Sequence, residues 1–402
     1  MNSRERVVTA LNHKEPDKVP LDIGGTDSSG ITATAYNRLR KHLNLPAGRT
    51  EIIDTYGQIV RIEDDIREVI KPDTDILFKG NLKWKPFVLS DGSQCRIPEK
   101  WNPEKTKDGA HIIRNKKGMV TARMPKGGYY FDSVNAPLSQ ITDAGELKGF
   151  ADEIESYDFP AHADESLDDV AIKAEKMFEN TDLAVVANLG GHLLAAGQNL
   201  FGYERFMMDL LTEKKLAHAF LEMLTNAYMD RYDQYLDKVG EYIQIVLIND
   251  DLGIQTGPML SLECYKEMIW PYQKKLFQFI KSKADVFLLL HSCGSVYKFI
   301  PLLIEAGADA LNPIQMTAAD MDTKKLKDEF GRDMTFWGGG CDTQKVLCNG
   351  SAEQVKEEVK RRISDLAPGG GFVFTQVHNI QHDVPPENIM AMIEAFNKYR
   401  DY

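Results

Sequence analysis

The chain has 402 residues, of which 43% are hydrophobic and 27% are charged, so it can bury one large core or two ordinary ones, as globular enzymes do. Its formal net charge of −12 argues against a surface that binds nucleic acid or anionic lipid, because phosphate groups require a positive field. Five cysteines form no disulfide framework, which favours a reducing, cytoplasmic location.

The first segment begins with a helical pattern at Arg4–Leu11, followed by a short apolar strand at Val19–Ile23 that ends in two glycines. A polar, helix-forming stretch continues to about Ile70. The chain start has no apolar run typical of a signal peptide, and no stretch approaches 18 uncharged apolar residues. We therefore expect no membrane span.

Between about residues 74 and 135 the pattern changes to short alternating runs. The runs LKWKPFVL and HIIRNKKGMVTARM carry Trp, Val, Ile and Thr, and DG, NKKG and KGG supply turns. We interpret this segment as a β-hairpin insertion in one domain that spans residues 1–402.

After an acidic connection, the chain alternates between apolar strands and amphipathic helices. Apolar strands that alternate with helices predict an α/β fold with a parallel sheet covered on both faces. The six expected strands, together with Val19–Ile23, come close to the eight of a (β/α)8 TIM barrel. A dinucleotide-binding fold is disfavoured, because no GxGxxG opens a helix after the first strand. The six are Leu183–Asn188, Ile243–Asn249, Val286–Leu290, Ala310–Pro313, Met334–Trp337 and Phe372–Gln376.

A metal site is suggested where these strands end. Residues two apart on an extended chain point to the same side, so His291 and Cys293 can bind one ion. Cys341 follows three glycines at a later strand end and could complete a His/Cys/Cys set. Three such ligands with an open fourth position describe catalytic zinc. The spacing alone leaves open the alternative of a half-buried histidine and two inert core cysteines.

Several blocks of the sequence resemble the uroporphyrinogen decarboxylase superfamily: RERVVTALNHKEPDKVP, NDDLGIQTGPMLS, LLLHSCGSVYKFIPLLIEAGADALNPIQ, FWGGGCDTQ and PGGGFVFTQVHNIQHDVPPENI. The resemblance implies a distorted (β/α)8 barrel with its pocket at the carboxyl ends of the strands. True uroporphyrinogen decarboxylases carry an arginine-bearing segment after the first strand, which holds substrate propionates. No arginine lies between Val19 and Tyr36, which argues against uroporphyrinogen as the substrate.

The other branch that the chain resembles is the zinc-dependent corrinoid methyltransferases, whose metal signature would fall on His291, Cys293 and Cys341. This resemblance implies Zn²⁺ and a cobalamin supplied by a corrinoid partner protein, since the chain has no DxHxxG-type motif. We expect the small-molecule methyl donor to be a methoxylated aromatic or another methyl ether. The alternatives are methyl transfer to a coenzyme M-like thiol, a metal-free decarboxylase or lyase that uses His291 and Asp250, and a non-catalytic corrinoid-binding or regulatory subunit.

Supporting roles are assigned to polar residues at other strand ends. Asp250 and Asp251 could be a fourth ligand, a partner of a ligand or a proton source, or only a solvated turn or helix cap. His378 could protonate a leaving oxygen, or be structural. Aromatic side chains could line a planar pocket or simply pack, and a homodimer would be unsurprising. The expected substrate-binding residues are Asn188, His192, Gln255, Trp337 and Asn379; the aromatic candidates are Phe201, Tyr203, Trp270, Tyr297 and Trp337.

Overall fold

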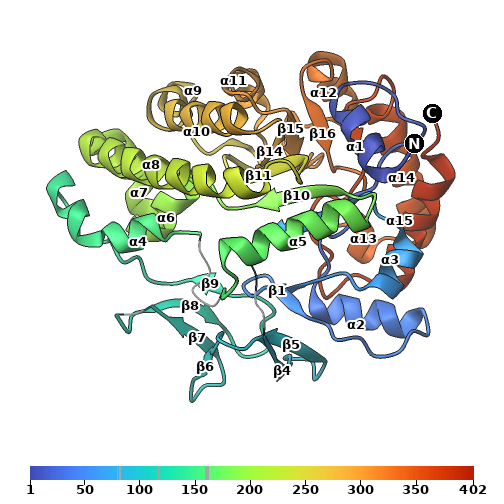
Figure 1. Cartoon of the computed structure of the whole chain (residues 1–402), viewed down its shortest axis with the longest axis horizontal. Helices are drawn as coiled ribbons and strands as arrows, with labels where there is room; N and C mark the ends of the chain where they lie inside the picture. The colour runs from blue at the N-terminus through green and yellow to red at the C-terminus, as the bar shows by residue number, and fades with distance from the viewer. Residues whose placement is uncertain (79, 81–82, 116, 159–162) are drawn as a thin grey trace.

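The computed structural model describes residues 1–402 except 79, 81–82, 116 and 159–162. Its centre is a curled, seven-stranded sheet in the order β17-β16-β15-β14-β11-β10-β3, in which all neighbours are parallel. Helices cover the outer face of this sheet (Figure 1), which gives an α/β, TIM-barrel-like fold. The strands are β3 (Thr74–Phe78), β10 (Ala184–Asn188), β11 (Ile245–Asn249), β14 (Phe287–His291), β15 (Ala310–Asn312), β16 (Thr335–Trp337) and β17 (Phe372–Val373).

All six strands expected after the acidic connection are present, each within three residues of the expected bounds. The remaining strand differs from the expectation. It is β3, which begins where the sequence pattern predicts the start of the β-rich insertion, and Val19–Ile23 forms only a single parallel bridge, Leu21 to Phe374. An apolar pair such as Ile76-Leu77 suits a barrel strand as well as a hairpin, so the pattern alone did not separate them.

Residues 20–22 nevertheless lie in the gap between the two edge strands, β17 and β3. The Phe374 amide donates to the Pro20 carbonyl at 2.9 Å, and the Asp22 amide donates to the Phe374 carbonyl at 2.8 Å. On the other side, the Asp73 amide donates to the Leu21 carbonyl at 2.7 Å. This short segment therefore closes the ring in the eighth position, and the barrel is distorted there.

Two hydrophobic clusters explain why the strands are apolar on both faces. Val186, Leu247, Leu289 and Trp337 belong to an inner cluster, and the alternate strand residues pack outward against the helices. The amino-terminal end of the barrel is plugged by helix α1 (Ser3–Leu11), whose Val7 and Leu11 join the inner cluster. The helices around the sheet include α5 (Leu167–Asn180), α8 (Lys214–Val239), α10 (Trp270–Lys283), α11 (Ile300–Ala306), α12 (Thr323–Phe330), α14 (Ala352–Leu366) and α15 (Pro386–Tyr399).

Outside the central sheet, the segment that follows β3 forms antiparallel strands, seen below the barrel in Figure 1. One hairpin pairs β4 (Trp84–Val88) with β5 (Gln94–Pro98). A second sheet contains β6 (Glu104–Lys105), β7 (His111–Arg114), β8 (Val120–Met124) and β9 (Asp132–Ser133). Both sheets adjoin the small pair β1 (Ile52–Asp54) and β2 (Ile59–Val60), because the Arg96 amide donates to the Thr50 carbonyl and the Phe131 amide to the Tyr56 carbonyl.

The carboxyl ends of the parallel strands meet at one end of the barrel, and the loops that follow them carry most of the residues singled out from the sequence. Short helices lie in these loops: α6 (Leu194–Phe201) and α7 (Tyr203–Thr212) follow β10, and α4 (Ala151–Glu155) precedes α5. Among the helices that the structure describes, none combines the length and apolar character needed to cross a membrane.

Candidate metal centre

His291 is the last residue of β14, and its imidazole is oriented by the neighbouring strand. The sheet register places His291 opposite Asn312, the last residue of β15. The Asn312 amide group donates to the Trp337 carbonyl at 2.9 Å, so its Oδ1 must face His291, whose Nδ1 lies 2.6 Å away. Nδ1 of His291 therefore carries the hydrogen, and Nε2 keeps its lone pair for a metal ion.

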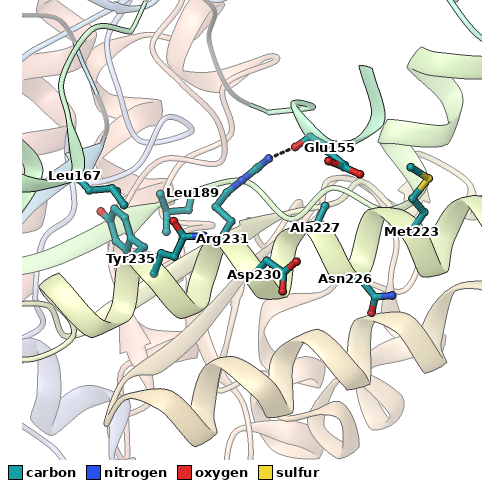
Figure 2. A pocket seen from close by; sticks show the side chains of 10 residues that line it. Glu155, Leu167, Leu189, Met223, Asn226, Ala227, Asp230, Arg231 and Tyr235 are labelled. Carbon is teal, nitrogen blue, oxygen red and sulfur yellow. Dashed lines mark hydrogen bonds between the residues drawn. The ribbon is translucent and has the colours of Figure 1, made fainter. Parts of the chain in front are cut away.

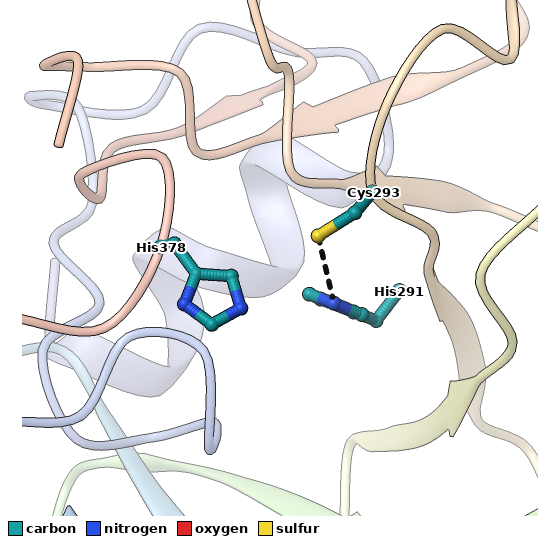
Figure 3. Close-up of side chains that lie close together, drawn as sticks. All are labelled: His291, Cys293 and His378. Carbon is teal, nitrogen blue, oxygen red and sulfur yellow. Dashed lines mark hydrogen bonds between the residues drawn. The ribbon is translucent and has the colours of Figure 1, made fainter. Parts of the chain in front are cut away.

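Cys293 and His378 bring two further ligand atoms to this nitrogen (Figure 3). The Cys293 thiol lies 3.5 Å from His291 Nε2, and His378 faces both from the loop after β17. One ligand atom from each of the three residues lies within 4.8 Å of the others. His378 Nδ1 is 3.0 Å from Asn379 Oδ1. Each of the two histidines thus has its Nδ1 hydrogen-bonded to an asparagine side chain. We call His291, Cys293 and His378 the metal triad.

The donor set of the metal triad fits a zinc ion. Two imidazole nitrogens and one thiolate are preferred zinc ligands, and three protein ligands leave a position for substrate. Burial raises the pKa of the Cys293 thiol, and the Asp251 carboxylate raises it further. A thiol of this kind is converted to thiolate when a metal cation binds it. The residues present therefore suit a bound cation.

Cys341, the expected third ligand, is not part of the metal triad, and His378 takes its place. Gly338 and Gly339 adopt positive φ angles of 96° and 76°, and these left-handed residues turn the chain after β16. Cys341 is fully buried beyond this turn. Burial raises the pKa of its thiol, and a hydrogen bond with Glu358 of α14 adds to the effect. Cys341 thus packs between the sheet and α14.

The two adjacent aspartates have different environments. The Asp251 carboxylate accepts a 2.8 Å hydrogen bond from the Cys293 amide and lies 3.8 Å from His291 Nε2, so it borders the metal triad. The Asp250 carboxylate is buried and accepts hydrogen bonds from the Leu194 and Ala195 amides at the start of α6, both at 3.0 Å. Burial raises the pKa of Asp250 to about 6. Asp250 therefore caps the start of α6, and a helix cap is one of the roles that the sequence left open for it.

The loop Gly24–Gly30 also reaches the strand ends. The Ser28 hydroxyl donates to Asn312 Oδ1 at 2.8 Å, so this loop touches the residue that orients His291. The Asp27 carboxylate accepts a 2.5 Å hydrogen bond from Asn188, at the end of β10. Burial raises the pKa of Asp27 to about 7, with a further contribution from the charge of Asp54. The loop thus presents carboxylate rather than cationic side chains.

Trp337 lies below the site rather than in its wall. It is fully buried in the inner cluster, and its indole N–H donates to the Asp22 carboxylate at 2.8 Å. Asp22 had no role assigned from the sequence. It accepts four more hydrogen bonds, from Gly25, Thr26, Ser29 and Thr74, so it fastens the loop Gly24–Gly30 to the barrel.

Most of the other residues expected to bind substrate instead hydrogen-bond to, or pack against, neighbouring protein groups. Gln255 accepts a 2.9 Å hydrogen bond from Gln315, which in turn accepts one from the Gly294 amide at 2.8 Å, beside Cys293. The aromatic candidates outside the barrel pack or bond locally. Phe201 contacts Phe206 and Phe220, Tyr203 is exposed, the Trp270 indole donates to the Leu302 carbonyl, and Tyr297 bonds to Glu329.

His192 forms an ion pair that the sequence did not predict. Its Nδ1 lies 2.8 Å from the Asp158 carboxylate, which also accepts a 2.6 Å hydrogen bond from Tyr228. Burial lowers the pKa of His192, but the charge and hydrogen bond of Asp158 outweigh it and raise the pKa to about 9. For Asp158, burial is likewise outweighed by His192, and its pKa is lowered. The sequence offered no signal, because 34 residues separate the partners.

A cavity of about 500 Å³ lies on the flank of the barrel, beside α4, α5 and α8 (Figure 2). Glu155, Asp230, Arg231 and Tyr235 are among its lining residues, and no member of the metal triad is. This cavity is thus separate from the metal triad, which lies where active sites of this kind of barrel are usually found, at the carboxyl ends of the strands.

Comparisons with known proteins agree with the fold. Residues 148–399 match the family described as "Uroporphyrinogen decarboxylase (URO-D)". Curated relatives include the uroporphyrinogen decarboxylases of Legionella pneumophila (strain Corby), 25% identical over 200 residues, and Geobacter sulfurreducens, 24% identical over 189 residues. These matches cover 49% and 45% of the chain and 52% and 53% of the relatives, so the chain spans about half the length of the relatives it matches. Among solved structures, a methyltransferase from Methanosarcina mazei shares the fold with a TM-score of 0.62 and 16% identity, over 99% of both chains.

Proposed function

The chain belongs to the uroporphyrinogen decarboxylase family, and from this premise we propose that it is a zinc-dependent methyltransferase. It would move a methyl group from a methyl ether, favoured as a methoxylated aromatic, to the cobalt of a separate corrinoid protein. The proposal rests on the metal triad, in which a thiol and two imidazoles, each hydrogen-bonded to an asparagine, lie close together at the strand ends.

The chemistry follows from the donor set. Held by His291, Cys293 and His378, a zinc ion would supply a Lewis acid for the methylated oxygen and make it a better leaving group. Asn312 and Asn379 keep the two imidazoles in the tautomer that offers Nε2. Asp251 fixes the Cys293 backbone, and its half-exposed carboxylate can bind or orient a proton-bearing group beside the metal triad.

A decarboxylase of uroporphyrinogen is disfavoured by the loop Gly24–Gly30. A substrate with eight carboxylates needs cationic partners, whereas this loop brings the Asp27 carboxylate to Asn188, with Asp54 nearby. The curated relatives bear the name uroporphyrinogen decarboxylase, but they align with only half of this chain. A solved structure that shares the fold over 99% of both chains is described as a methyltransferase, which is compatible with the proposal.

Metal binding is the first test. The protein, purified under reducing conditions without chelators, is expected to contain about one zinc per chain. Cys293→Ser and His378→Ala should lose it, and Cys341→Ser should keep it, because Cys341 packs against α14. Wild-type protein that binds no zinc on titration would leave the metal-free lyase as the better hypothesis. Loss of zinc from Cys341→Ser alone would restore the ligand set expected from the sequence.

Methyl transfer is the second test. Zinc-loaded protein is mixed with a corrinoid protein in the Co(I) state and a panel of aryl and alkyl methyl ethers, and methyl–cobalt formation is followed by absorbance. Transfer from an ether, absent in Cys293→Ser, supports the proposal. Methyl–cobalt consumption by coenzyme M or another thiol, without activity on ethers, would instead identify the thiol methyltransferase.

A further inference from the structure

A second chemical group lies at the same end of the barrel as the metal triad, the His192–Asp158 pair. We propose, on the basis of the function proposed above, that His192 is the proton donor of the reaction. It delivers a proton to the oxygen that loses its methyl group, a task distinct from the metal ligation by His291, Cys293 and His378.

The loop that carries His192 lies against the strand that leads to the site. It follows β10 through Gly190-Gly191, and a Cβ atom at Gly191 would lie 2.9 Å from the Ile248 side chain of β11. Asp250 and Asp251, which directly follow β11, act electrostatically on His192. The Asp250 carboxylate accepts a 3.0 Å hydrogen bond from the Leu194 amide, two residues after His192, and the neighbouring Asp251 carboxylate lies 3.8 Å from His291 Nε2. The Asp250-Asp251 segment therefore connects the His192 loop with the metal triad.

The contacts of the pair define which nitrogen can react. The Asp158 carboxylate accepts from His192 Nδ1 at 2.8 Å, from the Tyr228 hydroxyl at 2.6 Å and from the Gly191 amide at 3.1 Å. Nδ1 of the imidazolium is thereby occupied, and Nε2–H is left as the proton that can be transferred. The side chain of His192 is 28% exposed, so it is open to a ligand while Asp158, at 11%, is enclosed.

Helix α8 holds both halves of the pair in place. Tyr228 donates to Asp158 and to the His192 carbonyl, and Tyr232 donates to the Gly190 carbonyl at 2.8 Å. Arg231 donates to the carbonyls of Tyr157, at 3.0 Å, and Glu155 (Figure 2). These three residues, at i, i+3 and i+4, share one helix face. An ordinary surface ion pair is not held by so many hydrogen bonds from one helix, so we infer that the position of His192 serves a function.

The surrounding groups favour the protonated imidazole. The carboxylates of Asp158, Asp250 and Asp251 raise the pKa of His192. The positive charge of His192 in turn partly offsets the rise in pKa that burial causes at Asp27. The Tyr157 ring approaches it edge-on, with ring centroids 6.3 Å apart. At neutral pH His192 is therefore charged, with a proton available to a leaving group.

The proposed step balances with the corrinoid as co-reactant. The carbon–oxygen bond of the ether breaks, and its electron pair stays on the oxygen. The methyl carbon bonds to Co(I) of the reduced corrinoid protein, which supplies both electrons of the new bond. The oxygen takes the proton from His192 Nε2 and leaves as the alcohol or phenol, and the imidazole is reprotonated from solvent.

The test compares leaving groups. His192→Gln should slow transfer from methoxybenzene-type ethers about 10²- to 10⁴-fold, the usual contribution of a general acid. The same variant should lose less than about tenfold on 4-nitroanisole, whose phenolate leaves without a proton. Asp230→Asn, an exposed position on the same helix, serves as the matched control and should keep wild-type rates on both ethers. An equal loss on all ethers, or no loss on the poorer leaving group, would overturn the proposal.

A second measurement does not depend on turnover. NMR titration of ¹³C-labelled histidine in metal-free protein should show a resonance, absent in His192→Gln, with a midpoint near 9 that falls in Asp158→Asn. A midpoint at or below that of free histidine overturns the proposal even if the enzyme is active. If wild-type protein binds zinc but demethylates no ether, the function proposed above and the donor role of His192 fail together, and a raised midpoint then shows only that the His192–Asp158 ion pair is present.

Discussion

Asn312 offers a quantitative test of how the metal triad is built. Its Oδ1 accepts from His291 Nδ1 at 2.6 Å and from Ser28 at 2.8 Å, and its amide group donates to the Trp337 carbonyl. Asn312→Ala removes the acceptor that fixes the His291 tautomer. Loss of such a partner weakens metal binding by about 10- to 100-fold, or roughly 1.4–2.8 kcal/mol.

The same substitution should also destabilise the metal-free protein. Asn312 is 1% exposed, and its loss leaves the Trp337 carbonyl and His291 Nδ1–H buried without this partner. Each unsatisfied group costs about 1–3 kcal/mol. Asn312→Asp separates the two effects, because a carboxylate still accepts from His291 but cannot donate to Trp337. It should keep zinc affinity within about threefold of wild type while losing stability by about 1–3 kcal/mol.

The assay is competition for zinc with a chromophoric chelator under reducing conditions, combined with urea unfolding of the metal-free protein. Asn388→Ala is the matched control, since Asn388 is also a buried asparagine that donates to backbone carbonyls, those of Leu347 and Gly350. It should lower stability and leave zinc affinity unchanged. If Asn312→Ala binds zinc within twofold of wild type, the tautomer reasoning is refuted.

Three further predictions concern stability. Asp250→Ala should cost about 1–3 kcal/mol in urea unfolding, because two amides of α6 lose their acceptor, and should leave zinc content intact. Asp73→Ala should lower the free energy of unfolding by about 3–5 kcal/mol, because the buried Arg6 and Arg400 both lose their ion pair with Asp73. A smaller loss of stability than in Asp17→Ala would contradict this prediction. The pKa of His192 is raised to about 9, so its contribution is complete below about pH 6.5 and disappears as pH rises through 9. The stability difference between wild type and His192→Gln should thus shrink by about 1–3 kcal/mol between pH 6 and 10, and a difference independent of pH would argue against the pair.

The strands of the barrel could be predicted because their signal is local. Each of the six later strands is a short apolar run between polar loops, and burial on both faces requires that composition. The place of Val19–Ile23 could not be predicted in the same way. Whether it pairs as a full strand depends on Phe374 and Asp73, which are far away in the chain.

For the candidate site too, only the part that depends on residues close in the sequence could be predicted. His291 and Cys293 lie two residues apart, so the strand period alone brings them together. The third member of the metal triad comes from a later strand end, and the sequence offered two candidates, Cys341 after β16 and His378 after β17. Only the left-handed turn at Gly338-Gly339 and the arrangement of β17 beside β16 decide between them, and neither can be derived from residue spacing.

The closure of the ring by residues 20–22 has a consequence for biosynthesis. The hydrogen bonds from this segment to Phe374 join parts of the chain about 350 residues apart, whereas most other barrel strands pair with a neighbour in sequence. On the ribosome, α1 and the closing segment emerge before the barrel strands but must wait for β17 before both edges of the sheet are paired. Until then, the side of residues 20–22 that pairs with Phe374 has no partner, and a chaperone that recognises nascent polypeptides could bind this open edge until the last strand is synthesised.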